Sequence, residues 1–170
     1  MVANAGIVPA WRESESIDLG EWDEAFAVNA RGVMATIKQA VPFMKVGGGS
    51  IVIMASVNAL IGHARQAAYV ASKHAALGIA RSAAQDLGRY GIRVNALCPG
   101  PIATEALRER LRDRANDGGP SEKETMERYN QTALGRIATV DEVAKTALFL
   151  ASDLASGITG QAITVDAGAA

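Results

Sequence analysis

The apolar residues of this chain alternate between short continuous runs and long stretches with helical spacing. Short apolar runs are typical of buried strands, and apolar residues recur at helical intervals over residues 21–45 and 66–89. Strands that alternate with helices form a parallel sheet, because each helix carries the chain back to the start of the next strand. We therefore expect an α/β fold with strands at residues 1–3, 50–55, 92–97 and 161–165. Further helices are expected at 104–114, 122–131 and from Thr139 to about Ala151.

Local signals mark where the expected helices begin and end. Asp18 is a plausible cap for the helix over residues 21–45, and Thr139 with Glu142 forms a capping box. Gly91 lies just past the helix over residues 66–89, as at a helix C-terminus. The three glycines at 47–49 follow a helix and precede a strand. A phosphate-binding turn has the reverse order, so we interpret them as a connector.

Four strands with helical crossovers make only half of a doubly wound sheet. A complete dinucleotide-binding fold also has a glycine-rich turn between its first strand and first helix, and these 170 residues contain no such turn. The expected fold class is therefore α/β, the C-terminal half of a doubly wound Rossmann-type parallel sheet with flanking helices. We expect residues 1–170 to be a single, N-terminally truncated domain.

Composition excludes several kinds of partner. The chain has 17 basic and 18 acidic residues and a net charge of −1, which favours neither nucleic acid nor an anionic membrane. No apolar run is long enough to span a bilayer, and the N-terminus does not resemble a secretory signal. The single cysteine, Cys98, is compatible with a cytoplasmic protein. It lies far in sequence from His63 and His74, so we expect no metal site.

Tyr69 and Lys73 lie four positions apart on the expected helix over residues 66–89. This spacing places both side chains on one face, so the ammonium can lie near the phenol. A free tyrosine has a pKa of about 10, and lowering it to about 7 requires roughly 4 kcal/mol in favour of the phenolate. A nearby cation in a dry site can supply much of that stabilisation. Taken alone, however, the pair is also compatible with an ordinary surface contact.

Three further features strengthen the functional interpretation. Ser56 follows a strand, and Pro99-Gly100 follows the next, so both lie at the carboxyl edge of the sheet where such folds bind ligands. Asn29 lies inside a helix, where its side chain does not favour local structure. By itself Asn29 is also compatible with a helix-interior polar group that a neighbour satisfies.

Together, Asn29, Ser56, Tyr69 and Lys73 resemble, in order and spacing, the catalytic tetrad of the short-chain dehydrogenases/reductases. Asn4-Ala5-Gly6 is similar to that family's Asn-Asn-Ala-Gly motif, with Ala3 in place of the first Asn. The segment from Pro99 to Thr104 is similar to its Pro-Gly-x-x-x-Thr motif. Further similarity extends over residues 135–136, 149–153 and 158–168, with Ala167 where the family usually has Gly. The tail most resembles 3-oxoacyl reductases and sugar or diol dehydrogenases.

The resemblance implies an NAD(P)-dependent oxidoreductase that interconverts a secondary alcohol and a ketone. Tyr69 is then the general acid/base, and Lys73 lowers its pKa and holds the nicotinamide ribose. Ser56 orients the substrate oxygen, and Asn29 supports Lys73. The cofactor, NAD or NADP, is expected to contact Asn4, Ala5, Gly6, Tyr69, Lys73, Pro99, Gly100, Ile102 and Thr104. The residue that selects between NAD and NADP is absent from this chain.

Other residues receive simpler interpretations. We expect His63 and His74 to be ordinary, and Cys98 to be a small apolar residue of the core or pocket. The charges over residues 105–114 are compatible with a solvated helix face, whereas the resemblance implies a substrate lid.

Expectations for assembly and activity complete the sequence prediction. The helix over residues 66–89 carries eight alanines and Gly78, and with the helix over 21–45 it is expected to form the isologous interface of a homodimer or homotetramer. The 170 residues alone are expected neither to bind NAD(P) tightly nor to turn over substrate. The alternative function is that of a catalytically inactive family member that acts as a binding or oligomerisation partner.

Overall fold

Four parallel strands form the sheet of the computed structural model, which describes residues 1–169. In spatial order they are β1 (Val2–Ala3), β2 (Gly49–Met54), β3 (Ile92–Pro99) and β4 (Ala162–Val165). Strands β2 and β3 pair from Gly49 opposite Ile92 to Met54 opposite Leu97. The predicted α/β fold with a parallel sheet is confirmed, and each strand lies within two residues of its predicted position.

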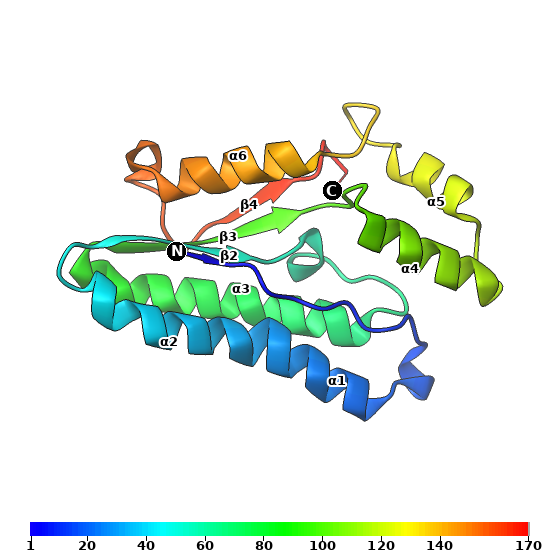
Figure 1. Ribbon diagram of the computed structural model, residues 1–170, viewed down its shortest axis with the longest axis horizontal. Coiled ribbons are helices and arrows are strands. Elements are labelled where there is room, and N and C mark those ends of the chain that lie inside the picture. The colour runs from blue at the N-terminus through cyan, green and yellow to red at the C-terminus, as the bar shows by residue number, and fades with distance from the viewer. Residues whose placement is uncertain (170) are drawn as a thin grey trace.

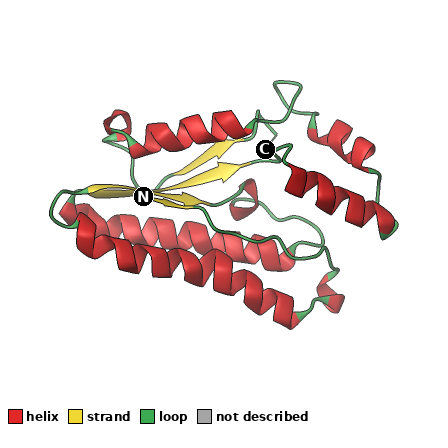
Figure 2. Ribbon diagram, viewed as in Figure 1, coloured by secondary structure: helices red, strands yellow, loops and turns green. Residues whose placement is uncertain are grey.

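Helices connect the strands and cover the sheet. The α-helices are α1 (Leu19–Phe26), α2 (Val33–Met44), α3 (Ala67–Leu87), α4 (Glu105–Asn116), α5 (Glu122–Tyr129) and α6 (Val140–Ala151). Short 3₁₀ turns lie at Ser14–Ser16, Val57–Ala59, Gly88–Tyr90 and Asp153–Ala155. Helices α2 and α3 cover one face of the sheet and α6 the other, whereas α4 and α5 lie past the carboxyl ends of β3 and β4 (Figure 1). Figure 2 shows that the loops leaving the strands run toward this same side.

Both faces of the sheet are buried. Ile51 and Ile53 of β2 pack with α2 and α3, whereas Val52 between them packs with Leu150 of α6. This alternation follows from the strand, in which successive side chains point to opposite faces. Burial of such a side chain stabilises the fold by about 1.5–3 kcal/mol relative to exposure. The central strands are therefore continuous apolar runs in the sequence.

Helix α3 approaches the sheet closely because its inner face is made of small residues. Ala76, Ala80 and Ala83 are buried there against the strands. The first turns of the same helix carry Tyr69 and Lys73. The packing of α3 on the sheet therefore places these two side chains near the carboxyl end of β2.

Capping side chains define where three of the helices begin. The Asp18 carboxylate accepts backbone hydrogen bonds at the start of α1, and Thr139 and Glu142 form the capping box of α6, as predicted. A second capping box, Ser121 with Glu124, opens α5 and was not predicted. Each box satisfies backbone N–H groups that have no partner within the helix.

The glycines at 47–49 are the predicted connector, here between α2 and β2. Gly48 has φ +69° and donates to the carbonyl oxygen of Met44 at 2.8 Å. A Cβ atom on Gly48 would lie 2.8 Å from the carbonyl oxygen of Gly91. The turn therefore requires glycine for both its backbone angle and its close approach to the neighbouring turn.

The helix predicted over residues 21–45 is interrupted in the structure. A π-helical turn, Ala27–Gly32, separates α1 from α2 and contains Asn29. The prediction of one regular helix was wrong here. Asn29 contacts the backbone of Ile7, which lies far away in the sequence, and the spacing of apolar residues carries no information about such a contact. Such π turns are frequent at functional sites.

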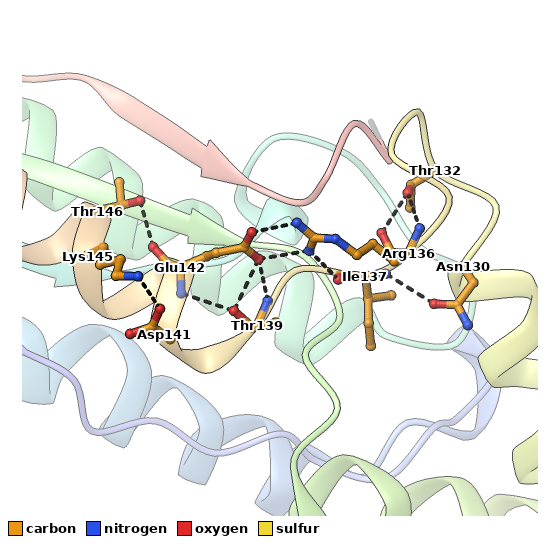
Figure 3. A network of polar contacts seen from close by, with 9 residues as sticks. All are labelled: Asn130, Thr132, Arg136, Ile137, Thr139, Asp141, Glu142, Lys145 and Thr146. Atoms are coloured by element: carbon orange, nitrogen blue, oxygen red, sulfur yellow. Dashed lines mark hydrogen bonds and ion pairs between the residues drawn. The ribbon is translucent and has the colours of Figure 1, made fainter.

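A polar network holds the segment between α5 and α6 (Figure 3). Asn130 Oδ1 accepts a hydrogen bond from the Ile137 amide at 3.1 Å, and Thr132 donates to the carbonyl oxygen of Arg136 at 2.7 Å. The Arg136 guanidinium donates twice to the Glu142 carboxylate, at 2.7 and 3.0 Å. The segment before α6 is therefore tied to the first turn of that helix.

Within residues 1–169, no helix combines the length and the apolar character needed to cross a bilayer.

Candidate active site

A cavity of about 360 Å³ lies at the carboxyl ends of β2 and β3. Ser56, which follows β2, Tyr69 of α3 and Gly100, which follows β3, all line it. Helix α4 supplies another part of the wall, with Leu107, Arg110, Leu111 and Arg114. The cavity therefore lies where parallel α/β sheets bind ligands, and α4 borders it, as the lid interpretation predicts.

Ser56 and Tyr69 come together although they lie thirteen positions apart in the sequence. Ser56 begins the 3₁₀ turn Val57–Ala59, and its hydroxyl oxygen accepts a hydrogen bond from the Asn58 amide at 3.2 Å. Ser56 lies close enough to Tyr69 to act on the pKa of its phenol, lowering it against the effect of burial. Two hydroxyl groups thus face the cavity side by side, an arrangement that can bind one carbonyl or alcohol oxygen.

The phenol of Tyr69 does not have the lowered pKa that the Tyr-Lys spacing predicts. Burial raises the pKa of Tyr69, because it disfavours the phenolate. The neighbouring Ser56 side chain and the positive charge of Arg110 oppose this shift without reversing it.

Lys73 lies beside the tyrosine ring rather than at its hydroxyl group. Its Nζ donates to the carbonyl oxygen of Met54 at 2.9 Å and lies 5.6 Å from the centroid of the Tyr69 ring. Burial lowers the pKa of Lys73 to about 8, a shift that the nearby Cys98 thiol group opposes. The ammonium is therefore engaged by the end of β2, which explains why it does not lower the pKa of Tyr69.

Asn29 is fully buried and joins three parts of the chain. Its Oδ1 accepts from the Ile7 amide at 2.8 Å, and its Nδ2 donates to the Ile7 carbonyl oxygen at 2.9 Å and to Ser72 Oγ at 3.0 Å. The side chain thus pairs with the segment after β1 as a neighbouring strand would, and it also reaches α3. The π turn presents Asn29 for these contacts.

The Asn4-Ala5-Gly6 segment follows β1 and is exposed. A Cβ atom on Gly6 would lie 3.3 Å from both Asn29 Oδ1 and Lys73 Nζ. Gly6 therefore lets the backbone approach Asn29 and Lys73 closely. Neither Asn4 nor Ala5 lines the cavity.

The segment after β3 forms one edge of the cavity. Gly100 lies so close to Asp166 that an added Cβ atom would be 2.8 Å from the Asp166 Cβ atom. Ile102 pairs with Ala138 in an isolated parallel bridge, and Thr104 caps α4 by accepting from the Leu107 amide at 3.2 Å. Gly100, Ile102 and Thr104 line the cavity, whereas Pro99 ends β3 itself.

Comparison with known proteins identifies the family. A family model described as enoyl-(acyl carrier protein) reductase matches residues 1–170. The short-chain dehydrogenase reductase 4 of Arabidopsis thaliana is 40% identical over 174 residues, which cover 99% of this chain and 55% of the relative. The chain belongs to the short-chain dehydrogenase/reductase family. The D-beta-hydroxybutyrate dehydrogenase of Rhizobium meliloti is a further relative, 34% identical over 99% of this chain and 66% of its own length.

Solved structures of this family share the fold. Levodione reductase superposes with a TM-score of 0.91 at 31% identity, covering 98% of this chain and 64% of the reductase. A Beutenbergia cavernae structure with bound NADP superposes with a TM-score of 0.85 at 35% identity, covering 98% and 64%. The chain thus spans between about half and two thirds of the length of these proteins. The Rossmann-type α/β fold of the sequence prediction is confirmed.

Several cavity residues were not found from the sequence. Trp11, Arg110, Arg114 and Asp166 line the cavity, and so does His63, whose ring centroid lies 5.1 Å from that of Trp11. We expected His63 to be ordinary, and its place in the wall differs from that expectation. The interpretation of residues 105–114 as a substrate lid could have indicated that the two arginines face the cavity. No sequence pattern around Trp11 indicates that it lies in the wall.

Cys98 and His74 lie outside the cavity wall. Cys98 is fully buried in the core, as predicted for a small apolar residue, and burial raises the pKa of its thiol. His74 is exposed on α3, with Nδ1 3.0 Å from the Val70 carbonyl oxygen. In the part of the chain that the structure describes, no three His, Cys, Asp or Glu side chains are grouped to hold a metal ion.

Proposed function

We propose that the protein is an NAD(P)-dependent oxidoreductase that interconverts a secondary alcohol and a ketone. The observation that carries this proposal is the paired hydroxyl groups of Ser56 and Tyr69 on one cavity, with Lys73 one turn further along α3. Two hydroxyl groups can hold a substrate oxygen from two sides, and one can exchange a proton with it. Membership of the family and dehydrogenase names among the relatives support the same chemistry.

Tyr69 is the proposed general acid/base, and Ser56 the group that orients the substrate oxygen. In the reduction, Tyr69 donates its proton to the carbonyl oxygen, and in the oxidation it accepts the alcohol proton. Burial raises its pKa, so the neutral phenol that donates the proton is favoured without cofactor. We propose that Lys73, which does not lower the pKa of Tyr69 in this structure, stabilises the phenolate once the proton has left. Asn29 holds the segment and helix on which Lys73 depends.

The residues around the cavity fit the nicotinamide end of NAD or NADP. Gly100 allows close approach at the carboxyl end of β3, and Ile102 and Thr104 border the same space. We propose that these residues, Pro99, and the exposed Asn4-Ala5-Gly6 segment bind that end of the cofactor, with Lys73 at its ribose. When bound, the nicotinamide supplies or accepts the hydride. The described residues include no glycine-rich strand-to-helix turn for the pyrophosphate.

The lack of a glycine-rich turn among the described residues supports a second candidate function, that of a catalytically inactive binding or oligomerisation partner. The chain spans 55–66% of the two relatives, and half of a dinucleotide site can be retained without turnover. Calorimetric titration of the 170 residues with NADH and NADPH is expected to show no micromolar binding, because only the nicotinamide end has partners among the described residues.

The experiment that tests the proposed function is a spectrophotometric assay of NAD(P)H oxidation with a panel of ketones, and of NAD(P)⁺ reduction with secondary alcohols. In the intact enzyme, with a complete dinucleotide-binding fold, we expect turnover of at least one ketone and its alcohol, and a loss of about 10²-fold or more in Ser56→Ala. Ser82→Ala, which changes an exposed serine of α3, is the matched control and should leave turnover unchanged. Absence of turnover with both cofactors, or full activity in Ser56→Ala, would contradict the proposal.

A further inference from the structure

Helix α4 carries two kinds of arginine. Arg108 and Arg112 form ion pairs with glutamates, Arg108 with Glu122 at 2.7 Å and Arg112 with Glu105 at 2.5 Å. Arg110 and Arg114, one turn apart, line the cavity instead. Neither of these two forms an ion pair with any residue from 1 to 169.

Arg114 is held in place with its hydrogen-bonding groups unused. Its guanidinium carbon lies 4.1 Å from the centroid of the Trp11 ring, and Gly119 packs against its side-chain stem. Its Nε and Nη1 atoms are buried and have no hydrogen-bond acceptor among the described residues. Stacking on an aromatic ring favours the cation but supplies no acceptor in the plane of the guanidinium. Buried donors without partners are unfavourable and rare, so these two require an explanation, and a bound anion is one.

Arg110 links this cationic side of the cavity to the reacting side. Its positive charge is close enough to Tyr69 to act on the phenol. The wall also holds the carboxylate of Asp166, and the two arginines outnumber it. An anion in the cavity would therefore lie in a favourable field while its other end reaches Tyr69 and Ser56.

Much of the remaining wall is apolar, although Asn58, His63, Gln66, Thr104 and Tyr129 also line it. Val8, Trp11, Ile61 and Leu107 contribute hydrocarbon or aromatic surface to a space of about 360 Å³. A planar guanidinium matches a carboxylate with two parallel hydrogen bonds, a geometry that a neutral oxygen cannot reproduce. The wall thus suits a small ligand with an apolar body and one planar anionic group.

We propose that the substrate is an oxo acid or hydroxy acid whose carboxylate is bound by Arg114 and Arg110. This inference rests on the proposed function for the reaction itself, and it adds the chemical class of the substrate. The carboxylate anchors one end of an apolar body, so that the oxygen-bearing carbon at the other end meets Tyr69 and Ser56.

The test compares a charged and a neutral probe of the same shape. Binding of cyclohexanecarboxylate and of cyclohexanecarboxamide to the purified protein is measured by calorimetry, with the fluorescence of Trp11 as a second signal. We expect the carboxylate to bind at least about 10-fold more tightly than the carboxamide, because hydrogen bonds to a charged group are stronger than those to a neutral one. Arg114→Gln should remove this preference and leave amide binding unchanged, and Arg110→Gln should reduce it. The matched control Arg112→Gln, on the same helix but paired with Glu105, should retain it.

Three results would overturn the inference. Equal weakening of both probes in Arg114→Gln and Arg110→Gln would mean that the arginines only shape the lid. Tighter binding of inorganic phosphate than of the carboxylate would point to a phosphorylated ligand. Loss of NADPH affinity in the arginine variants, with the carboxylate preference intact, would assign them to the cofactor.

Turnover of the uncharged ketone cyclohexanone separates this inference from the proposed function. If the protein reduces ketones but shows no preference for a carboxylate, the function stands and the inference is wrong. If carboxylate binding depends on Arg114 but no ketone is reduced, the anion site stands and the proposed function is wrong.

Discussion

Gly100 and Asp166 approach each other so closely that a side chain at position 100 would not fit. A Cβ atom there would be 2.8 Å from the Cβ atom of Asp166 and 3.1 Å from its Cα atom, so the Asp166 backbone would have to shift to admit it. We expect Gly100→Ala to lower the free energy of unfolding by about 1–3 kcal/mol, as overpacking does. Gly157→Ala, where an added Cβ atom meets nothing within 4 Å, is the control in the same urea denaturation experiment. Equal stability of the two variants would contradict the close approach.

Ala167 occupies a position where the family usually has glycine, and its backbone conformation is one that favours glycine. Its φ is +58°, in the left-handed region that a Cβ atom disfavours by about 1–2 kcal/mol. The Ala167 carbonyl oxygen accepts a hydrogen bond from the Leu134 amide at 3.1 Å, which holds this conformation. We expect Ala167→Gly to raise the free energy of unfolding by up to about 1 kcal/mol, because the strain is partly offset by the greater freedom of glycine in the unfolded chain. Thermal denaturation measures the change, and a lower Tm would contradict it.

At the scale of elements, the start of α6 depends on one carboxylate. Glu142 accepts two hydrogen bonds from Arg136 and one from the Thr139 amide, and these contacts lower the pKa of Glu142 to about 2 (Figure 3). A folded-state pKa below the unfolded value means that the unfolded chain binds more protons between about pH 2 and pH 4.5. The contribution of this carboxylate to stability is thus present above pH 4.5 and is lost as the pH falls toward 2.

Arg136→Gln removes the largest cause of that shift. We expect the pKa of Glu142 to rise toward its ordinary value in this variant, measured by NMR titration of the side-chain carboxyl carbon. Lys145→Gln, which removes a cation bound to Asp141 on the same helix, is the control and should leave Glu142 low. A pKa that stays near 2 in Arg136→Gln would assign the shift to the capping box alone.

Elements with local causes were predictable from the sequence, and elements with distant causes were not. The capping contacts of Asp18 and Thr139 lie within one turn of their helices, so a short window contains all the information. The π turn depends on the hydrogen bonds between Asn29 and Ile7, and the residues next to Asn29 in the sequence do not indicate this contact. Similarly, Ser56, Tyr69 and Lys73 could be named from their spacing, whereas the contact of Trp11 with Arg114 exists only once α4 folds over the cavity.

At the scale of the whole molecule, we predict association through α3 and the α1–α2 pair. Helix α3 exposes Gly78 on its outer side, and α2 exposes Met34 and Phe43, the latter at 89%. Such a smooth face with apolar neighbours suits an isologous contact. Sedimentation of the intact protein at micromolar concentration should show a dimer or tetramer, and Gly78→Arg should shift it toward the monomer. The control Gly157→Arg should retain the oligomer, and a wild-type monomer would contradict the prediction.

The central claim for the molecule is that Tyr69 moves the proton of the reaction. The most direct measurement is kcat of the intact enzyme for Tyr69→Phe with a ketone and NAD(P)H, together with the Kd of the cofactor, in parallel with the control Tyr90→Phe at the far end of α3. Because the change removes only the hydroxyl group, we predict that kcat falls by at least about 10²-fold while the cofactor Kd changes little. Tyr90→Phe should keep wild-type turnover. Turnover near that of the wild type in Tyr69→Phe would contradict the assignment of Tyr69 as the acid/base.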